Sequence, residues 1–172
     1  MSEAAKQPET QNISLSVKNL TMAVLDEADL IDELRLAVIR QRDAIRDGDH
    51  AEAHSLMKDI QDISFDVQAQ EMLRTRLADA AAAGLECEPR VSALFNAIAV
   101  NTSFSESEAS LFNEASEHLK YAVSTLKMEI SVLSGLVEHN EKFGAMLLSE
   151  WKRINTGFGS GLNQSGGLDF RG

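Results

Sequence analysis

Apolar residues recur at every seventh position along the first part of the chain. The recurring positions are Val17, Val24, Ile31, Val38 and Ile45, with Leu20 and Leu34 three residues after two of them. Such a stripe is typical of a helix that packs along other helices. Glu27 and Gln41 occupy the intervening positions and interrupt it. We predict a helix over residues 15–47, ended by Gly48 in a left-handed turn, with Asp49 capping the next helix.

Three further helices follow from the same kind of pattern. The spacing of Leu56, Ile60, Ile63 and Val67 predicts a helix over 50–83, interrupted at Gln70 and Arg74 and ended near Gly84. Pro89 can open a short helix over 89–101 at its first turn. Ser105 and Glu108 form a capping box that begins a helix over 105–155. Its stripe reads Phe112, Ala115, Leu119, Ala122, Leu126, Ile130, Leu133, Val137, Leu147, Trp151 and Ile154.

These elements predict an all-α protein. At 1.5 Å per residue the last helix would reach on the order of 75 Å, so we expect an elongated antiparallel bundle or coiled coil whose long C-terminal helix projects at one end. Residues 15–155 form the bundle domain. The polar residues 1–14 are expected to be a disordered tail. Residues 156–172 are expected to be a flexible tail, because six of the ten glycines lie from 157 onward.

The composition and net charge of the chain argue against several classes of function. The chain has 172 residues, of which 44% are hydrophobic, enough for one domain with a core. Its 27 acidic residues against 16 basic ones give a net charge of -11, which argues against binding nucleic acid or an anionic membrane surface. We find neither a secretory signal nor an apolar run of about 20 residues that could cross a bilayer. We therefore expect a cytoplasmic protein that does not insert stably into membranes.

The residues that could carry chemistry lack suitable partners in the sequence. His50 and His54 are four residues apart, but the stretch HAEAH does not match the zinc-binding HExxH pattern. Cys87 lies between two glutamates, which disfavour its reactive thiolate. We expect no catalytic residue, metal site or cofactor. Phosphotransfer through His54 stays a weaker alternative, because Lys58 stands four residues later rather than the three that such domains use.

Surplus apolar residues mark the late part of the last predicted helix. They give it more apolar surface than one packing stripe requires, and such surface suits docking of a partner helix. The alternative is that these residues pack within the protein's own bundle. The candidate client-binding residues share one helical face at three- and four-residue spacing: Leu136, Asn140, Phe143, Leu147 and Trp151.

Two segments of the chain resemble the FlgN family of flagellar type III export chaperones, and the likeness covers most of residues 20–160. One segment is AIRDGDHAEAHSLMKDIQDISFDVQAQEMLRTRLADAA, a helix, a short Gly-Asp turn and a second helix that ends in an arginine-bearing segment. The other is LVEHNEKFGAMLLSEWKRINTGFG, in which Asn140 stands where the family has an asparagine. Phe158-Gly159 replaces the family's common Tyr-Gly pair.

The resemblance implies a non-enzymatic, cytoplasmic chaperone. Such proteins bind the C-terminal helices of flagellar hook-associated proteins at the hook–filament junction, prevent their premature assembly and deliver them to export-gate components. A monomer or weak dimer is expected. The alternative class is a scaffolding coiled-coil protein, in which the heptad stripe of residues 17–45 would pair with a second copy. Mass measured in solution separates the two.

Overall fold

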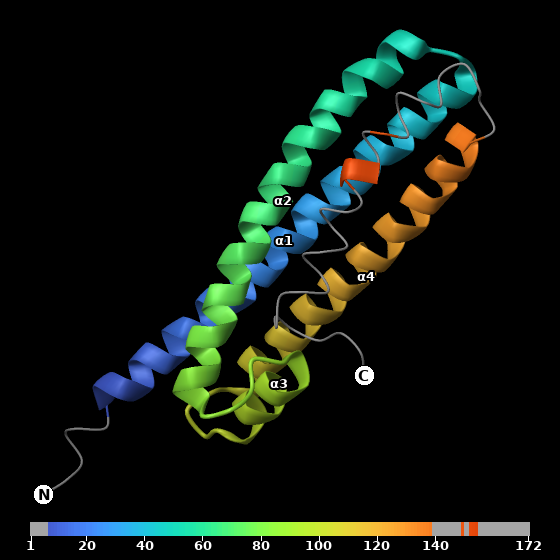
Figure 1. Ribbon diagram of the computed structural model, residues 1–172. Helices are drawn as coiled ribbons and strands as arrows, with labels where there is room; N and C mark the ends of the chain where they lie inside the picture. Colours follow the sequence, from blue (N-terminus) through green and yellow to red (C-terminus); the bar gives the residue numbers. More distant parts are fainter. Residues whose placement is uncertain (1–6, 139–148, 150–151, 155–172) are drawn as a thin grey trace, which may run out of the picture. The chain divides into compact units, whose positions relative to one another are not determined.

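The computed structural model describes residues 7–138, 149 and 152–154 (Figure 1). These residues form the helices α1 (Gln7–Asp47), α2 (His50–Leu85), α3 (Val91–Val100) and α4 (Glu106–Glu138), and residues 152–154 are also helical. No strand occurs among them, which confirms the all-α prediction. None of the helices in this part of the chain is long and apolar enough to cross a lipid bilayer. The predicted tail at 156–172 lies outside the described residues.

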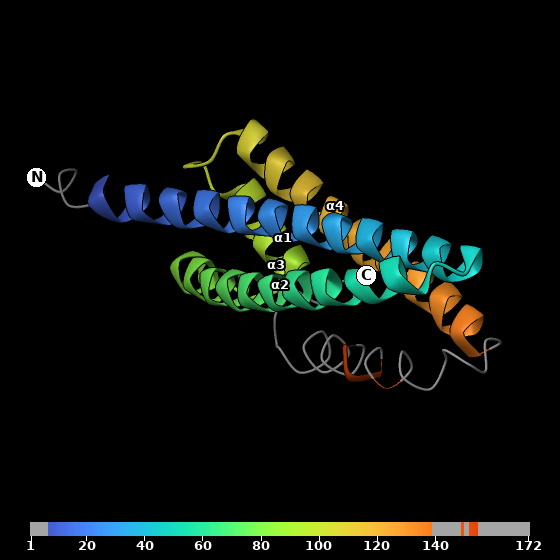
Figure 2. The ribbon, with the colours of Figure 1, turned by 90° about the horizontal axis from the view of Figure 1, so that it is seen from above.

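The described residues gather into two compact units. The first unit contains residues 7–27 and 70–120, and the second contains residues 28–69 and 121–138. The helices α1, α2 and α4 each contribute a segment to both units, whereas α3 belongs to the first alone. Figure 2 shows the same helices from a second direction.

The first unit has a core built from all of its helices. Leu20 and Val24 of α1 and Phe112 of α4 are fully buried, as are Leu94 and Ile98 of α3. The part of α2 in this unit contributes only small buried apolar residues, namely Ala78, Ala81 and Ala82. Alanines leave room for neighbouring helices to approach closely, so larger side chains from α1, α3 and α4 can fill the interior.

The second unit buries the predicted stripes of three helices. The buried side chains are Ile31, Leu34, Val38 and Ile45 of α1, Leu56, Ile60 and Val67 of α2, and Leu126, Ile130, Leu133 and Val137 of α4. One expected core residue, Ile63, is only half-buried, and the next residue, Ser64, is buried instead. The Ser64 hydroxyl donates to the carbonyl of Ile60 at 2.6 Å, which satisfies the polar group in the core.

The first helix begins earlier than its apolar pattern predicted. It starts at Gln7 rather than Leu15, so residues 7–14 are helical and not a disordered tail. Pro8 stands in the first turn, where a missing N–H leaves no hydrogen bond unmade. Ile13 packs against Gly84 of α2, since a Cβ atom at Gly84 would lie 3.2 Å from Ile13 Cγ1. This contact gives the early turns of α1 a partner in the first unit.

Two helix ends have the same hydrogen-bonding motif with different residues. At the end of α1, the amide of Asp49 donates to Ala44 at 2.9 Å and Gly48 takes the left-handed conformation. At the end of α2, the amide of Cys87 donates to Ala82 at 3.0 Å, and Glu86 is left-handed with φ of 53°. Both are Schellman motifs. The left-handed residue that ends α2 is therefore Glu86, two residues after the predicted Gly84. A glutamate is strained in this backbone conformation, whereas a glycine is not.

The predicted N-terminal caps are confirmed for α2 and α4. The Asp49 carboxylate accepts from the amide of Glu52 at 3.0 Å. The Ser105 hydroxyl accepts from the amide of Glu108 at 3.2 Å, and the Glu108 carboxylate accepts from the amide of Ser105 at 2.8 Å. The hydrogen bonds from Ser105 hold the pKa of Glu108 below its usual value. Pro89 does not open α3, because the N-cap is Arg90.

The polar residues that interrupt the apolar stripes make contacts between α1 and α2. Arg74 Nε donates to Glu27 Oε2 at 2.5 Å, with both side chains at most 3% exposed. One turn earlier on α2, Gln70 Nε2 donates to the carbonyl of Ala23 at 3.1 Å. In the second unit, Gln41 Nε2 donates to the carbonyl of Ala53 at 3.0 Å. Each interruption therefore joins α1 to α2 through a polar contact inside its own unit.

In the contact between Glu27 and Arg74, burial has the largest effect on the pKa of Glu27. It raises the pKa of Glu27 above its ordinary value, against the opposing effect of the Arg74 guanidinium, while Glu71 adds a smaller upward effect. Arg74 Nη1 is buried and has no hydrogen-bond partner among the described residues. A buried ion pair of this kind adds little net stability, but a single partner left alone is strongly unfavourable.

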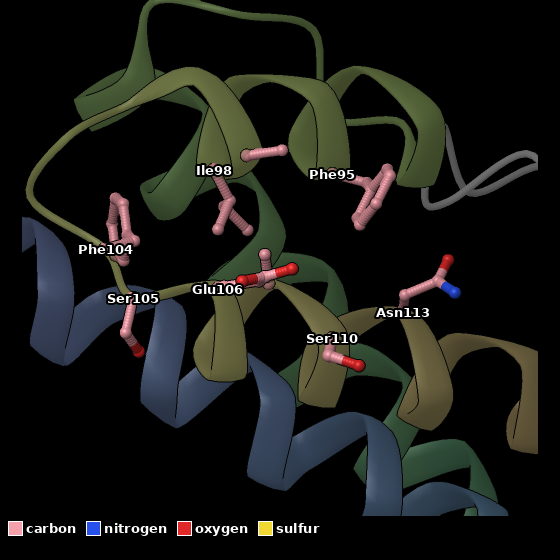
Figure 3. A pocket seen from close by; sticks show the side chains of 9 residues that line it. Phe95, Ile98, Phe104, Ser105, Glu106, Ser110 and Asn113 are labelled. Carbon is pink, nitrogen blue, oxygen red and sulfur yellow. The ribbon is translucent and has the colours of Figure 1, made fainter.

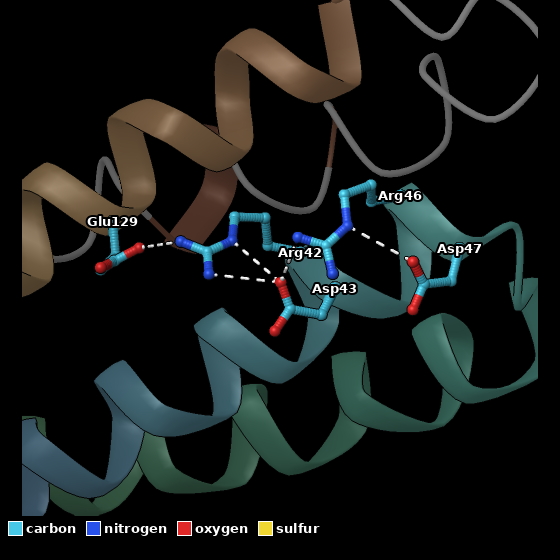
Figure 4. Close-up of polar contacts among 5 residues, drawn as sticks. All are labelled: Arg42, Asp43, Arg46, Asp47 and Glu129. Carbon is cyan, nitrogen blue, oxygen red and sulfur yellow. Dashed lines mark hydrogen bonds and ion pairs between the residues drawn. The ribbon is translucent and has the colours of Figure 1, made fainter.

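An ion-pair cluster joins α1 and α4 in the second unit (Figure 4). Arg42 Nη1 donates to Glu129 Oε2 at 2.6 Å, while its Nη2 lies 3.2 Å from Asp43 Oδ1. Arg46 pairs with Asp43 at 3.4 Å and with Asp47 at 3.3 Å. Since Arg42 and Glu129 are mostly buried and directly bonded, their contact is a specific polar link between these two helices.

Replacing Arg74 with Met is expected to lower the free energy of unfolding at pH 7 by about 3–5 kcal/mol, because the Glu27 carboxylate would be buried alone. Loss of the guanidinium removes the effect that opposes burial, so the pKa of Glu27 should rise further in the folded variant than in the folded wild type. The deficit should therefore grow as pH rises through the range between the two folded-state pKa values and shrink on acidification. Glu27→Leu with Arg74→Met should unfold near the wild-type denaturant midpoint. Additive losses in the double variant would contradict this account.

The two Schellman motifs provide an internally matched test. Glu86→Gly should raise the free energy of unfolding by about 0.5–1 kcal/mol, because glycine adopts positive φ without steric strain. Gly48→Ala should lower it by a similar amount, because alanine is strained at positive φ. No heavy atom lies within 4 Å of the added Cβ, so a steric clash with a neighbour does not contribute. Urea unfolding of both variants measures the effects, and a loss of stability in Glu86→Gly would contradict a steric origin.

Candidate partner-binding surfaces

The described residues contain no assembled metal centre. No three His, Cys, Asp or Glu side chains among them lie in a position to bind one ion. His50 and His54 are exposed near the start of α2 and His118 is half-buried on α4, while His139 lies outside the described residues. The position of the exposed pair agrees with the interpretation that these two histidines face solvent.

Most of the predicted client-binding residues fall outside the part of the chain that the structure describes. Asn140, Phe143, Leu147 and Trp151 are among the residues not described, so the predicted stripe stays a prediction. Leu136 is described and is half-buried near the end of α4. Its neighbour Val137 is buried in the second unit, which leaves Leu136 at the border between the core and the surface.

Exposed apolar side chains lie on α4 away from its core stripe. Tyr121, Met128 and Val132 are 68%, 60% and 50% exposed. At 100° per residue their spacings of seven and four place them within about 40° of one another around the helix. Leu136 follows Val132 after four further residues. We call Tyr121, Met128, Val132 and Leu136 the α4 stripe.

The sequence also indicates the α4 stripe, although the predicted core face of this helix did not include its residues. The core stripe of α4 accounts for Leu126, Ile130, Leu133 and Val137, all of which are buried as predicted. Tyr121, Met128 and Val132 are apolar residues that this stripe leaves over, and their own helical spacing indicates a second face. Exposed apolar side chains therefore lie on α4 from Tyr121 to Val132, ahead of the predicted surplus that begins at Leu136.

A pocket of about 610 Å³ lies between α3 and the start of α4 in the first unit (Figure 3). Phe95 and Ile98 project into it from α3, and Phe104 lines it from the connecting loop. The side chains of Ser105, Glu106, Ser110 and Asn113 provide its polar lining. These lining residues include no histidine, thiol or lysine, so they offer neither a strong nucleophile nor a base poised near neutral pH.

Cys87 follows α2 and is half-buried. Burial is the main cause that raises the pKa of its thiol, and the carboxylate of Glu88 adds to the effect. The sequence predicted this direction from the flanking glutamates, but desolvation proves to be the larger cause. The thiolate is therefore scarce at neutral pH, and this environment is unlike that of a catalytic cysteine.

Alkylation of Cys87 by iodoacetamide is expected to be slower at pH 7.5 than that of the same cysteine in the urea-unfolded chain. The rate should rise roughly tenfold per pH unit up to the thiol pKa, because only the thiolate reacts. Mass spectrometry of timed samples measures both rates. A folded chain that reacts faster than the unfolded one would contradict the raised pKa.

Comparison with protein-family models, with curated proteins and with solved structures finds no match.

Proposed function

We propose that this protein is a non-enzymatic cytoplasmic chaperone for flagellar export, as its resemblance to the FlgN family implies. Its clients would be the C-terminal helices of hook-associated proteins, which it would keep unassembled and transfer to the export gate. The observation that carries the proposal is the α4 stripe, a row of large apolar side chains along one helix in which Tyr121, Met128 and Val132 are exposed and Leu136 is half-buried.

The physical requirements of such a chaperone agree with this surface. A client helix that is destined to assemble elsewhere has an apolar face that must stay covered until export. A row of Tyr, Met and Val side chains can cover it, because methionine adapts its shape to different partners and tyrosine supplies a broad ring. The net charge of -11 favours solubility and keeps the complexes apart.

The scaffolding alternative receives less support from the core. It required the heptad residues of α1 to pair with a second copy, but Val17, Val24, Ile31, Val38 and Ile45 are each at most 3% exposed. These residues are covered by helices of the same chain within their own units. The α4 stripe lies instead on a helix whose core face is already in use, so its apolar side chains are open to a partner.

Replacing Met128 and Val132 together with Ala is expected to weaken binding of a hook-associated C-terminal segment by more than tenfold. Burial of each large apolar side chain contributes about 1.5–3 kcal/mol before ordering costs, and 1.4 kcal/mol corresponds to a factor of about ten. The melting temperature should be nearly unchanged, because both side chains are at least half exposed. Calorimetric titration and a thermal melt measure the two effects.

The chain offers a matched control pair. Met72 and Val100 are 58% and 81% exposed and lie in the first unit, so Met72→Ala with Val100→Ala removes the same groups elsewhere. This control should bind like the wild type. A third variant, Phe143→Ala with Trp151→Ala, tests the predicted continuation of the surface through Leu136, Asn140 and Leu147. If the α4 pair and the control pair lose affinity equally, the α4 stripe does not bind the client.

A further inference from the structure

A second apolar surface lies between α1 and α2 in the second unit. It is a groove of about 580 Å³ with buried Ala37 and Leu56 at its base. Leu36 is 54% exposed beside it, and Ile39 and Ile63 are half-buried. The departure of Ile63 from the core, where its spacing had placed it, is explained by this position on the groove wall. The helices thus leave aliphatic surface open between them.

The rim of this groove is acidic. Glu33 of α1 and Asp59 and Asp62 of α2 line it, and all three are exposed. None forms an ion pair with another described residue. The one cation among the residues that line the groove, Arg40, pairs with Glu52 at 3.2 Å. Three carboxylates therefore surround an apolar groove with little opposing charge, which makes the potential there negative.

The polar contacts between the helices place these carboxylates on both sides of the groove. Gln41 bonds to Ala53 and Arg40 pairs with Glu52. Because the two helices are antiparallel, the number of a residue on this part of α1 and the number of the residue that faces it on α2 add to about 92–94. Glu33 then lies opposite the part of α2 that contains Asp59 and Asp62. Like charges that face each other across a groove repel, and a partner that brings positive charge between them relieves the repulsion.

Two other occupants fit these observations less well. A divalent cation would need converging ligands, and no three acidic, histidine or cysteine side chains of the described residues form such a group. A second copy of this chain would bring its own excess of negative charge, since the net charge is -11. A groove between two antiparallel helices is shaped for a third helix, which can lay apolar residues at i, i+3 or i+4, and i+7 along its base.

We propose that the α1–α2 groove binds an amphipathic helix from a partner protein, with its apolar face against Leu36, Ile39 and Ile63 and with Lys or Arg residues beside Glu33, Asp59 and Asp62. Residues 56–63 of α2 extend about 10 Å along the groove, so the contact covers about two turns of the partner helix. This surface is separate in sequence from the α4 stripe. The inference does not depend on the proposed client or on export.

The test uses the full chain and two synthetic peptides. Each is an amphipathic helix with leucines at i, i+3 and i+7, and they differ only in lysine or glutamate at the flanking positions. Fluorescence anisotropy measures their binding. We expect the lysine peptide to bind, the affinity to fall as salt is raised, and the glutamate peptide to bind at least about tenfold more weakly, because its charges meet the acidic rim.

Variants in which the acidic side chains of the groove are neutralised test whether the lysine peptide binds there. Glu33→Gln with Asp59→Asn and Asp62→Asn should weaken binding of the lysine peptide about tenfold, since each exposed ion pair contributes a few-fold. The control, Asp26→Asn with Asp79→Asn and Glu106→Gln, changes the net charge equally at exposed positions that do not line the groove. It should retain most of the affinity, because long-range attraction alone is screened by salt.

A variant of the apolar wall completes the design. Leu36→Ala should weaken the lysine peptide several-fold without loss of helicity, because Leu36 is half exposed. Equal binding of the two peptides, or equal loss in the groove and control triples, would overturn the proposal. It would also be overturned by a concentration-dependent dimer in ultracentrifugation that the groove triple variant abolishes, because a second copy would then cover the groove. Client binding through α4 is measured separately and is unaffected by these outcomes.

Discussion

The buried ion pair of Glu27 with Arg74 constrains the packing of α1 against α2 in the first unit. An apolar heptad stripe can shift by seven residues and still bury similar side chains, so apolar packing alone specifies register weakly. A carboxylate and a guanidinium that are both at most 3% exposed permit no such shift, because each would lose its partner inside the core. The bond from Gln70 to Ala23 lies one turn away and supports the same alignment.

In the second unit, uncharged groups limit the alignment of α1 against α2. Gln41 is fully buried, and its amide donates to the carbonyl of Ala53 across the interface of α1 and α2. This contact lies close to the turn at Gly48, where a left-handed glycine and the Asp49 cap reverse the chain. A short turn limits how far two helices can slide, so the glutamine and the turn determine the same register. The facing residues of the acidic groove follow from it.

The two candidate binding surfaces arise because each helix has only one face in the core. On α4 the core stripe is complete without Tyr121, Met128 and Val132, yet these positions carry large apolar side chains at 50% exposure or more. Between α1 and α2, Leu36 and Ile63 remain outside the core while three carboxylates border them. The first surface suits an apolar helical face, and the second suits one flanked by cations. The two therefore favour partners of different chemistry.

The amino-acid sequence by itself determined the helices, their caps at Asp49 and Ser105, and the buried faces of α1 and α4, because all of these follow from local spacing and local hydrogen bonds. It also showed that Glu27, Gln41, Gln70 and Arg74 break the apolar stripes, but not that they bond across the interface, since pairing depends on how two helices are aligned. The early start of α1 and the displaced end of α2 were likewise decided by tertiary structure, where Ile13 packs against Gly84. The exposure of the α4 stripe and of Ile63 depends on which face each helix turns inward, and only the packed helices determine that.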